Sequence, residues 1–246
     1  MSAAPPTDGK ATLRSVAQEG GYDPGQATNL SRTPRKPRTR RRTQAERTAL
    51  SDARMFEAAK QLIIEQGTHA TTLKEVGERA GYSRGLASNR FGSKEALFSQ
   101  LVVQFNDSWT KELAYKVDNR TGAQACLAAL DAVESFLVNH SEYMQAMYIL
   151  WFESMSSHND VSKHLAAYHA IYRRDVAHWV RDGIEAEQVE VTVDPESYAF
   201  QFCSFIFGTI YQWLVAPDAV DIPQQFEAFR TTTSRIFGSG AKGNNS

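Results

Sequence analysis

TTLKEVGERAGYSRGLASNRFGSKEAL occupies residues 71–97, and the rest of the chain can be read outward from it. Thr71 or Thr72 is suited to cap a first short helix, because a threonine hydroxyl accepts a backbone N–H that the helix leaves unpaired. Apolar residues then follow at i, i+3 and i+7, as on one face of a helix. Gly81 comes directly after this pattern, where glycine commonly ends a helix. The stretch therefore begins with a short amphipathic helix.

A second short helix is predicted at 84–91, with Ser83 as its cap. Gly92 closes this helix, and Ser93 caps a third that starts at Lys94. Two short helices on either side of a glycine-containing turn form the helix-turn-helix pattern, in which the second helix enters the major groove of DNA. The alternative is an ordinary helical hairpin in the core of an all-α protein.

GYSRGLASNRFGSKEALF, residues 81–98, resembles the DNA-binding end of TetR-family repressors, and the resemblance extends more loosely over 55–101. It implies base contacts from Arg84, Gly85, Leu86 and Ser88, beside the predicted cap Ser83. It also implies phosphate contacts from Thr71, Thr72, Asn89, Arg90 and Lys94. Family members usually carry an aromatic residue late in the second helix, whereas this chain has Ser-Asn-Arg at 88–90. The resemblance therefore leaves the phosphate contacts open and suggests an operator preference particular to this chain.

The overall charge of −1 conceals a strong asymmetry between the two ends of the chain. Residues 1–42 carry a net charge of +6, and residues 96–246 carry −8. Seven positive and no negative side chains lie within 32–42, a segment that also contains two prolines. We predict a disordered basic arm over 1–42 whose Arg38, Arg40, Arg41 and Arg42 contact DNA phosphates or the minor groove. The alternative for the arm is a solvated, solubilising tail.

Helical patterns account for nearly all of the sequence between residues 43 and 238, which predicts an all-α fold of about nine helices. A capping box at 43–46 starts the first of them. We expect a three-helix DNA-binding domain over 43–93, a helical effector-binding and dimerisation domain over 94–238, and a disordered tail over 239–246. A break is expected near residue 140, between helices at 123–139 and 141–155.

Aromatic and methionine residues are dense between about 136 and 179, at helical spacings. The alternative is plain core packing, but tyrosine and tryptophan also suit an apolar pocket that forms a few hydrogen bonds. TetR-family proteins bind a small effector in this region. We therefore predict a pocket for a small apolar or aromatic effector, lined by Met144, Met147, Tyr148, Trp151, Tyr168, Tyr172 and Phe202.

The helix predicted from about residue 195 to 215 is apolar around most of its circumference, so more must cover it than one small chain supplies. A second copy would complete the cover, as in the usual TetR-family dimer formed by the last two helices. The predicted interface residues are Phe205, Gly208, Trp213, Phe226 and Phe229. The alternative is an internal core helix of a monomer.

Other functional classes receive little support from the sequence. It contains no phosphate-binding loop, hydrolase or zinc-protease motif, and its histidines lack the i, i+4 spacing of helical metal ligands. Neither a cofactor nor a metal is therefore expected. Two isolated cysteines, no secretory signal and no run of about 20 apolar residues favour a cytoplasmic, nucleoid-associated protein.

The sequence thus predicts a non-enzymatic, ligand-responsive repressor that binds a near-palindromic operator as a homodimer. Two alternatives remain at this point. One is an activator or dual regulator of the same architecture. The other is an all-α protein that binds small molecules and has a vestigial DNA-binding head.

Overall fold

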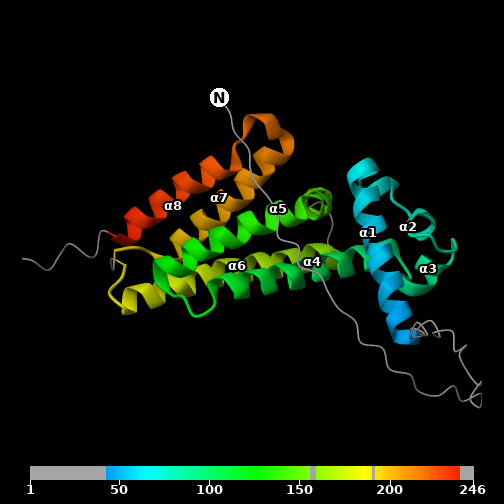
Figure 1. Ribbon diagram of the computed structural model, residues 1–246, viewed down its shortest axis with the longest axis horizontal. Coiled ribbons are helices and arrows are strands. Elements are labelled where there is room, and N and C mark those ends of the chain that lie inside the picture. The colour runs from blue at the N-terminus through cyan, green and yellow to red at the C-terminus, as the bar shows by residue number, and fades with distance from the viewer. Residues whose placement is uncertain (1–42, 156–158, 190–191, 239–246) are drawn as a thin grey trace, which may run out of the picture. The chain divides into compact units, whose positions relative to one another are not determined.

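The computed structural model describes residues 43–155, 159–189 and 192–238, and every regular element in them is helical (Figure 1). The prediction of an all-α fold is confirmed. The basic arm, including Arg38, Arg40, Arg41 and Arg42, and the tail at 239–246 lie outside the described residues. The elements are α1 (Gln44–Ala70), α2 (Leu73–Arg79), α3 (Leu86–Phe91), α4 (Lys94–Val117), α5 (Gly122–Ser154), α6 (Asp160–Glu185), α7 (Pro195–Val215), the 3₁₀ helix η1 (Pro217–Ala219) and α8 (Ile222–Gly238).

The described residues contain eight α-helices, because the two helices expected on either side of residue 140 are merged into α5. The break was located correctly, since His140 has non-helical angles (φ −139°, ψ 34°) and kinks α5. The chain continues as a helix beyond this kink instead of leaving through a loop. The kinked helix α5 packs on α1, α4 and α6.

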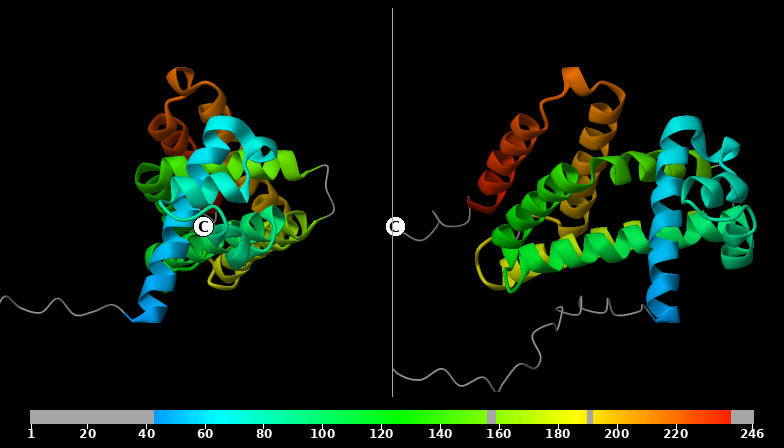
Figure 2. Two further views of the ribbon diagram at one scale, coloured as in Figure 1. Left: turned by 90° about the vertical axis from the view of Figure 1, so that its right-hand side faces the viewer. Right: turned by 45° about the vertical axis from the view of Figure 1, so that its right-hand side comes forward.

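The first three helices are organised by hydrogen bonds between residues close in sequence. Thr43 and Glu46 form a complete capping box at the start of α1, and Thr72 and Glu75 form another at the start of α2. Each box satisfies two backbone N–H groups that a helix end leaves unpaired. These helices group around the first turns of α4, and α1 also packs on α5 (Figures 1 and 2).

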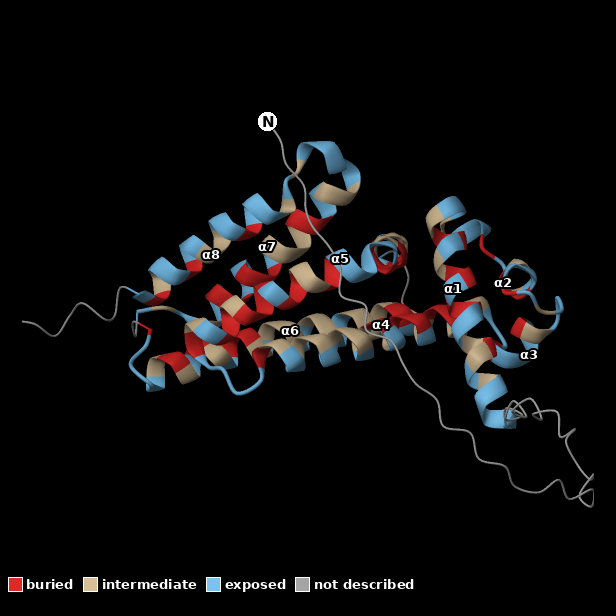
Figure 3. Cartoon of the chain, viewed as in Figure 1, coloured by how far each residue is buried: buried red, intermediate tan, exposed pale blue. Residues whose placement is uncertain are grey.

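The remaining helices form a bundle in which α4, α5 and α6 pack against one another and α7 packs on α6. Figure 3 shows their buried residues facing inward and the outer faces of α6 and α8 in contact with solvent. Phe105 of α4 lies at the centre, with ring centroids 5.4 Å from Phe136 and 5.2 Å from Tyr143. Burial of such rings is the main source of stability in this part of the fold.

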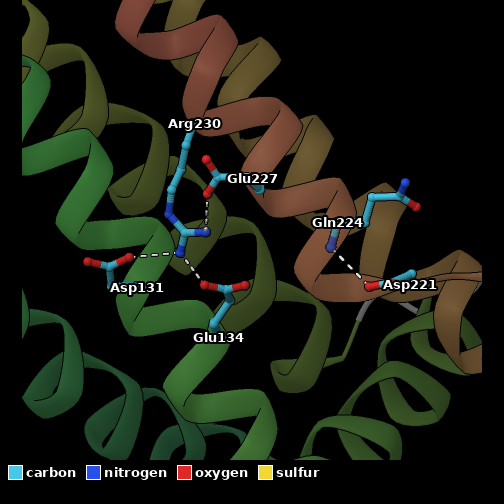
Figure 4. Close-up of polar contacts among 6 residues, drawn as sticks. All are labelled: Asp131, Glu134, Asp221, Gln224, Glu227 and Arg230. Carbon is cyan, nitrogen blue, oxygen red and sulfur yellow. Dashed lines mark hydrogen bonds and ion pairs between the residues drawn. The ribbon is translucent and has the colours of Figure 1, made fainter.

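The last helix is held to α5 by one arginine on its inner side (Figure 4). Arg230 donates to Asp131 at 2.7 Å and to Glu134, and its guanidinium also approaches Glu227 at 3.8 Å. Only a fifth of the Arg230 side chain is exposed, so these charge-assisted hydrogen bonds are partly shielded from water. Arg230 therefore fixes where α8 lies along α5.

Candidate functional site

The second helix of the helix-turn-helix pattern, α3, is held by two side chains and presents the others outward. Ala87 and Phe91 are buried, and the ring of Phe91 lies 5.5 Å from that of Phe56 in α1. Ser88, Asn89 and Arg90 are exposed. The backbone of α3 is thereby fixed by the core while a polar row faces solvent, as reading a DNA groove requires.

The two arginines of this surface are already paired with acidic side chains. Arg84 is exposed in the turn before α3 and forms an ion pair with Glu78 of α2. Arg90 lies 3.3 Å from Asp52 of α1, measured from Nε to Oδ1. Arg84 would have to exchange Glu78 for a base edge in order to read DNA, whereas Arg90 lies within ion-pair distance of Asp52 without a hydrogen bond to its Oδ1.

Four residues of the expected DNA surface have other roles in the structure. Thr71 is fully buried and donates to the carbonyl of Gly67 at 2.8 Å, so its side chain does not face a phosphate. Thr72 is exposed, but its hydroxyl bonds to the backbone and carboxylate of Glu75. Leu86 is half-buried. Ser83 does not cap α3, because Gly85 takes that position and no side chain caps it.

Lys94 was expected to contact a DNA phosphate. Its ammonium group instead forms hydrogen bonds with the DNA-binding head, residues 43–93. Nζ donates to the carbonyls of Thr68 at 3.0 Å and His69 at 3.1 Å. These carbonyls follow Gly67, whose φ of 77° ends the regular part of α1, so they lack partners within a helix. Lys94 is therefore a brace between α4 and the end of α1.

Glu153 of α5 holds the same segment from the other side. Its carboxylate accepts from the backbone N–H of Thr68 at 2.9 Å and also from the Thr68 hydroxyl. Hydrogen bonds to an ionised acceptor are stronger than neutral ones. The junction between α1 and α2 is thus bonded both to α4, through Lys94, and to α5, through Glu153.

The bundle contains an inner cavity of about 70 Å³ bounded by α4, α5, α6 and α7. Its wall includes five of the seven residues predicted to line an effector pocket, namely Met144, Tyr148, Trp151, Tyr172 and Phe202. Met147 does not line it, since it is fully buried on another side of α5. Tyr168 also lies elsewhere, with its ring 6.1 Å from that of His164. The hollow is therefore bordered by five of the predicted residues and not by the other two.

A larger groove of about 700 Å³ adjoins this cavity between α5, α6 and α7. Tyr148, Trp151 and Phe207 line both hollows and so form the wall between them. The groove is further lined by Phe152, Ser154, Met155, Ser162, Leu165, Ala166, His169, Gly208 and Tyr211. Ligand sites of proteins commonly measure about 300–1,000 Å³. The volume of the groove lies in this range, whereas the volume of the inner cavity is several times below its lower limit.

The polar groups along this wall differ in whether they have partners. The hydroxyl of Tyr148 donates to the Phe207 carbonyl at 3.0 Å, and that of Tyr172 donates to Asn106 at 2.9 Å. Burial raises the pKa of both phenols, so both keep their protons at neutral pH. Trp151 Nε1 and His169 Nε2 are also buried, but neither has a hydrogen-bond partner within the described residues. Each such buried group costs about 1–3 kcal/mol.

The outer faces of α7 and α8 contain the residues expected at a dimer interface. Phe205 and Phe229 are half-buried and stacked, with ring centroids 3.9 Å apart, and Trp213 is also half-buried. A Cβ added to Gly208 would have open space around it. Phe226 was misplaced, because it is fully buried within one chain and packs against Phe205. An outer apolar surface is thus present without Phe226.

Comparisons with known proteins agree with this arrangement. Residues 56–101 match the family model described as bacterial regulatory proteins, tetR family. The chain is 24% identical over 192 residues to the HTH-type transcriptional regulator YvkB of Bacillus subtilis, covering 78% of this chain and 98% of YvkB. The chain is thus similar to TetR-family regulators over its helix-turn-helix head and, more distantly, to a transcriptional regulator over most of its length.

Two solved structures of low sequence identity share the fold. One is SmeT of Stenotrophomonas maltophilia in complex with triclosan, with a TM-score of 0.64, 19% identity, and coverage of 75% of this chain and 90% of SmeT. The other is NalD of Pseudomonas aeruginosa, the secondary repressor of the MexAB-OprM efflux pump. It has a TM-score of 0.61, 19% identity, and coverage of 76% of this chain and 96% of NalD.

Sequence reasoning missed three residues that shape the head and the groove: Glu153, His169 and Gly77. The partner of Glu153 lies 85 residues away, so no local pattern could reveal it. His169 was considered only as a metal ligand. Gly77 is buried in α2, where an added Cβ would lie 3.0 Å from the Ser83 carbonyl, and its position on the apolar face was the available signal. Among the described helices, none is long and apolar enough to cross a membrane.

Proposed function

We propose that this regulator is a repressor that binds a near-palindromic operator as a homodimer in the cytoplasm and is released by a small, largely apolar effector. The observation that carries the proposal is on α5. This helix contributes Tyr148 and Trp151 to the wall of the hollows, and two residues later Glu153 binds the head at Thr68. One rigid element thereby connects a ligand-sized space to the DNA-binding helices.

The DNA contacts proposed for the head follow from the exposed row on and before α3. Arg84 is suited to form a bidentate contact to guanine after leaving Glu78, with Gly85 and Ser88 close to the base edges. Asn89 and Arg90 would bind phosphates and so position the head without reading sequence. The heads of a dimer would occupy successive major grooves, which is why a near-palindromic operator is expected. The arm at 32–42 would add phosphate contacts.

Release would follow from a ligand that binds one arrangement of the bundle better than the other. A ligand shifts such an equilibrium only by its difference in affinity for the two states. Movement of α5 at Trp151 would be transmitted to Thr68 by Glu153, and movement of α4 would be transmitted by Lys94. The spacing of the two heads would then no longer fit the groove repeat. SmeT was solved with triclosan and NalD is named as a repressor, which supports this choice over activation.

The proposal can be tested with DNA selected from a random library by the purified protein. Affinity is measured by fluorescence anisotropy for the wild type, for Arg84→Ala and for Arg174→Ala, an exposed arginine on α6 that serves as a matched control. Loss of a bidentate guanine contact costs about 1–3 kcal/mol, so Arg84→Ala should weaken specific binding by roughly 5- to 150-fold. Arg174→Ala should leave it unchanged. Equal affinity of both variants would mean that the head does not read DNA through Arg84.

A further inference from the structure

The wall between the two hollows differs chemically from the rest of their lining. The inner cavity is enclosed almost entirely by aromatic and aliphatic side chains, including Trp109, Val176 and Ile206. Trp151 Nε1 and His169 Nε2 are buried without a partner among the described residues, and their rings meet in a T-shaped contact with centroids 5.6 Å apart. Both residues also line the larger groove. Tyr148 and Ser162 on the same lining already form hydrogen bonds, so Trp151 and His169 supply the unpartnered buried polar groups of this wall among the described residues.

The free hydrogen-bonding capacity of this wall is defined by these two side chains. The indole N–H of Trp151 can only donate. Burial lowers the pKa of His169, with the neighbouring Arg173 charge acting in the same direction, so the ring is neutral at pH 7. A neutral imidazole nitrogen either donates or accepts, according to its tautomer. An oxygen atom placed here can accept from Trp151 and exchange a second hydrogen bond with His169.

The charges of the lining determine whether that oxygen can belong to an anion. Within the described residues neither hollow is lined by lysine or arginine, and the one charged side chain, Asp175, is acidic. A carboxylate or phosphate buried here would find no opposite charge on the lining, because Arg173, whose charge acts on His169, borders neither hollow. Burying an unpaired ion is far more costly than burying a neutral polar group. The lining therefore selects against anionic ligands such as fatty acids and acyl thioesters of phosphorylated carriers.

The volumes indicate how such a molecule is seated. The inner cavity of about 70 Å³ has room for about two water molecules at roughly 30 Å³ each, so a ligand that begins in the groove can enter it only by displacing wall side chains. The ring of Phe207 stacks on that of His169 with centroids 4.6 Å apart, and its centroid lies 6.1 Å from that of Trp151. Phe207 is therefore the part of the wall next to both residues. Displacement of Phe207 would open the cavity to the apolar part of the ligand.

We infer that the effector is a neutral, largely apolar molecule with one oxygen acceptor, such as a ketone, ester, lactone, alcohol or phenol, bound by Trp151 and His169. This inference rests on the proposed function, because it names the ligand class of the same pocket. It also assigns Trp151 a role in ligand selection in addition to packing.

Three biphenyls of matched shape provide the test: 4-acetylbiphenyl, the hydrocarbon 4-isopropylbiphenyl and biphenyl-4-carboxylate. Dissociation constants are measured by calorimetry on the full chain without DNA. The ketone should bind at least tenfold more tightly than the hydrocarbon, and the carboxylate should bind more weakly than the ketone. Trp151→Phe retains a ring but removes the N–H, so the advantage of the ketone should fall to below about threefold. Trp179→Phe, which also changes the inner cavity, should preserve it.

The possible outcomes distinguish this inference from the proposed function. Equal binding of ketone and hydrocarbon, or tightest binding of the carboxylate, would overturn the ligand class while leaving a working pocket. An unchanged preference in Trp151→Phe would overturn the role of Trp151. Binding of none of the three would overturn the pocket itself, and with it both the inference and ligand-induced release. Circular dichroism of each variant establishes that it is folded.

Discussion

The helix-turn-helix head and the bundle behind it are held together by contacts of very different range. In the head, the bonds that shape the turn join residues a few positions apart, such as Thr72 with Glu75 and the Tyr82 N–H with the Gly77 carbonyl. In the bundle, Tyr148 bonds to a carbonyl 59 residues away. Local bonds can be recognised in sequence, whereas distant ones depend on how helices pack.

The two regions also differ in whether their polar groups have hydrogen-bond partners in the free protein. On the head, Ser88 and Asn89 of α3 are polar and exposed, so water satisfies their side chains in the free protein. In the bundle, Trp151 and His169 are buried without partners in the described residues, and the groove beside them is apolar. The polar row of the head is solvated without DNA, whereas a ligand that supplied the missing bonds would stabilise the bundle.

The largest predicted effect is in the bundle core. Phe136→Ala removes a nearly fully buried ring that packs against Phe105 and Trp109, so the free energy of unfolding should fall by about 3–5 kcal/mol. All four tryptophans lie between residues 109 and 213, so their fluorescence follows the bundle while circular dichroism follows the whole chain. The mostly exposed Val138 on the same helix supplies the control, and Val138→Ala should change little. A loss below about 1 kcal/mol for Phe136→Ala would contradict the central role of this cluster.

The next effect concerns close packing in the head. A Cβ at position 77 would lie 3.0 Å from the backbone carbonyl of Ser83, which a rigid turn cannot easily move. Gly77→Ala should therefore destabilise the chain by about 1–3 kcal/mol in thermal or chemical unfolding followed by circular dichroism. Gly85 has a negative φ and open space around an added Cβ, so Gly85→Ala should leave stability nearly unchanged. Equal stability of the two variants would show that the turn is more adaptable than its geometry indicates.

A smaller effect is expected at the contact that joins the two regions. Glu153→Gln keeps the size of the side chain but replaces an ionised acceptor with a neutral one, which weakens its hold on Thr68. In the wild type, saturating 4-acetylbiphenyl should weaken DNA binding by about tenfold or more. In Glu153→Gln, that weakening should be smaller by a factor of about three or more. Ligand affinity itself should change little. Glu142→Gln, at an exposed position of the same helix, should respond as the wild type does. A wild-type response from Glu153→Gln would mean that another contact couples ligand binding to DNA binding.

The smallest effect is a dependence of stability on pH. Burial lowers the pKa of His169, so the unfolded chain binds more protons than the folded chain below about pH 6.5. The contribution of neutral His169 to stability is therefore complete above about pH 6.5 and is lost as pH falls towards the lower pKa of the folded state. Denaturant unfolding at pH 7.5 and 5.5 should show a smaller loss for His169→Gln than for the wild type. His178→Gln, an exposed histidine on the same helix, should match the wild type.

The sequence alone determined the features that depend on neighbours along the chain. The all-α class, the capping box at Thr43, a threonine cap at position 71 or 72, the glycine after α2 and the start of α4 at Lys94 were all predicted correctly. A cap or a tight turn forms within three to five residues, so the residue types of a short segment are enough to predict it. The family resemblance rests on the same short-range signals, which is why it was specific there.

Only the tertiary structure decided which way the side chains of each element face. Met147 and Trp151 are four residues apart on α5, yet one lies in the core and the other forms the wall of the hollows. Thr71 and Lys94 were expected at DNA, but they bond to carbonyls at the end of α1. A helix that is apolar around most of its circumference has no single inward face in sequence. The neighbours that pack on it determine which residues are core, which line a pocket and which polar atoms are left without a partner.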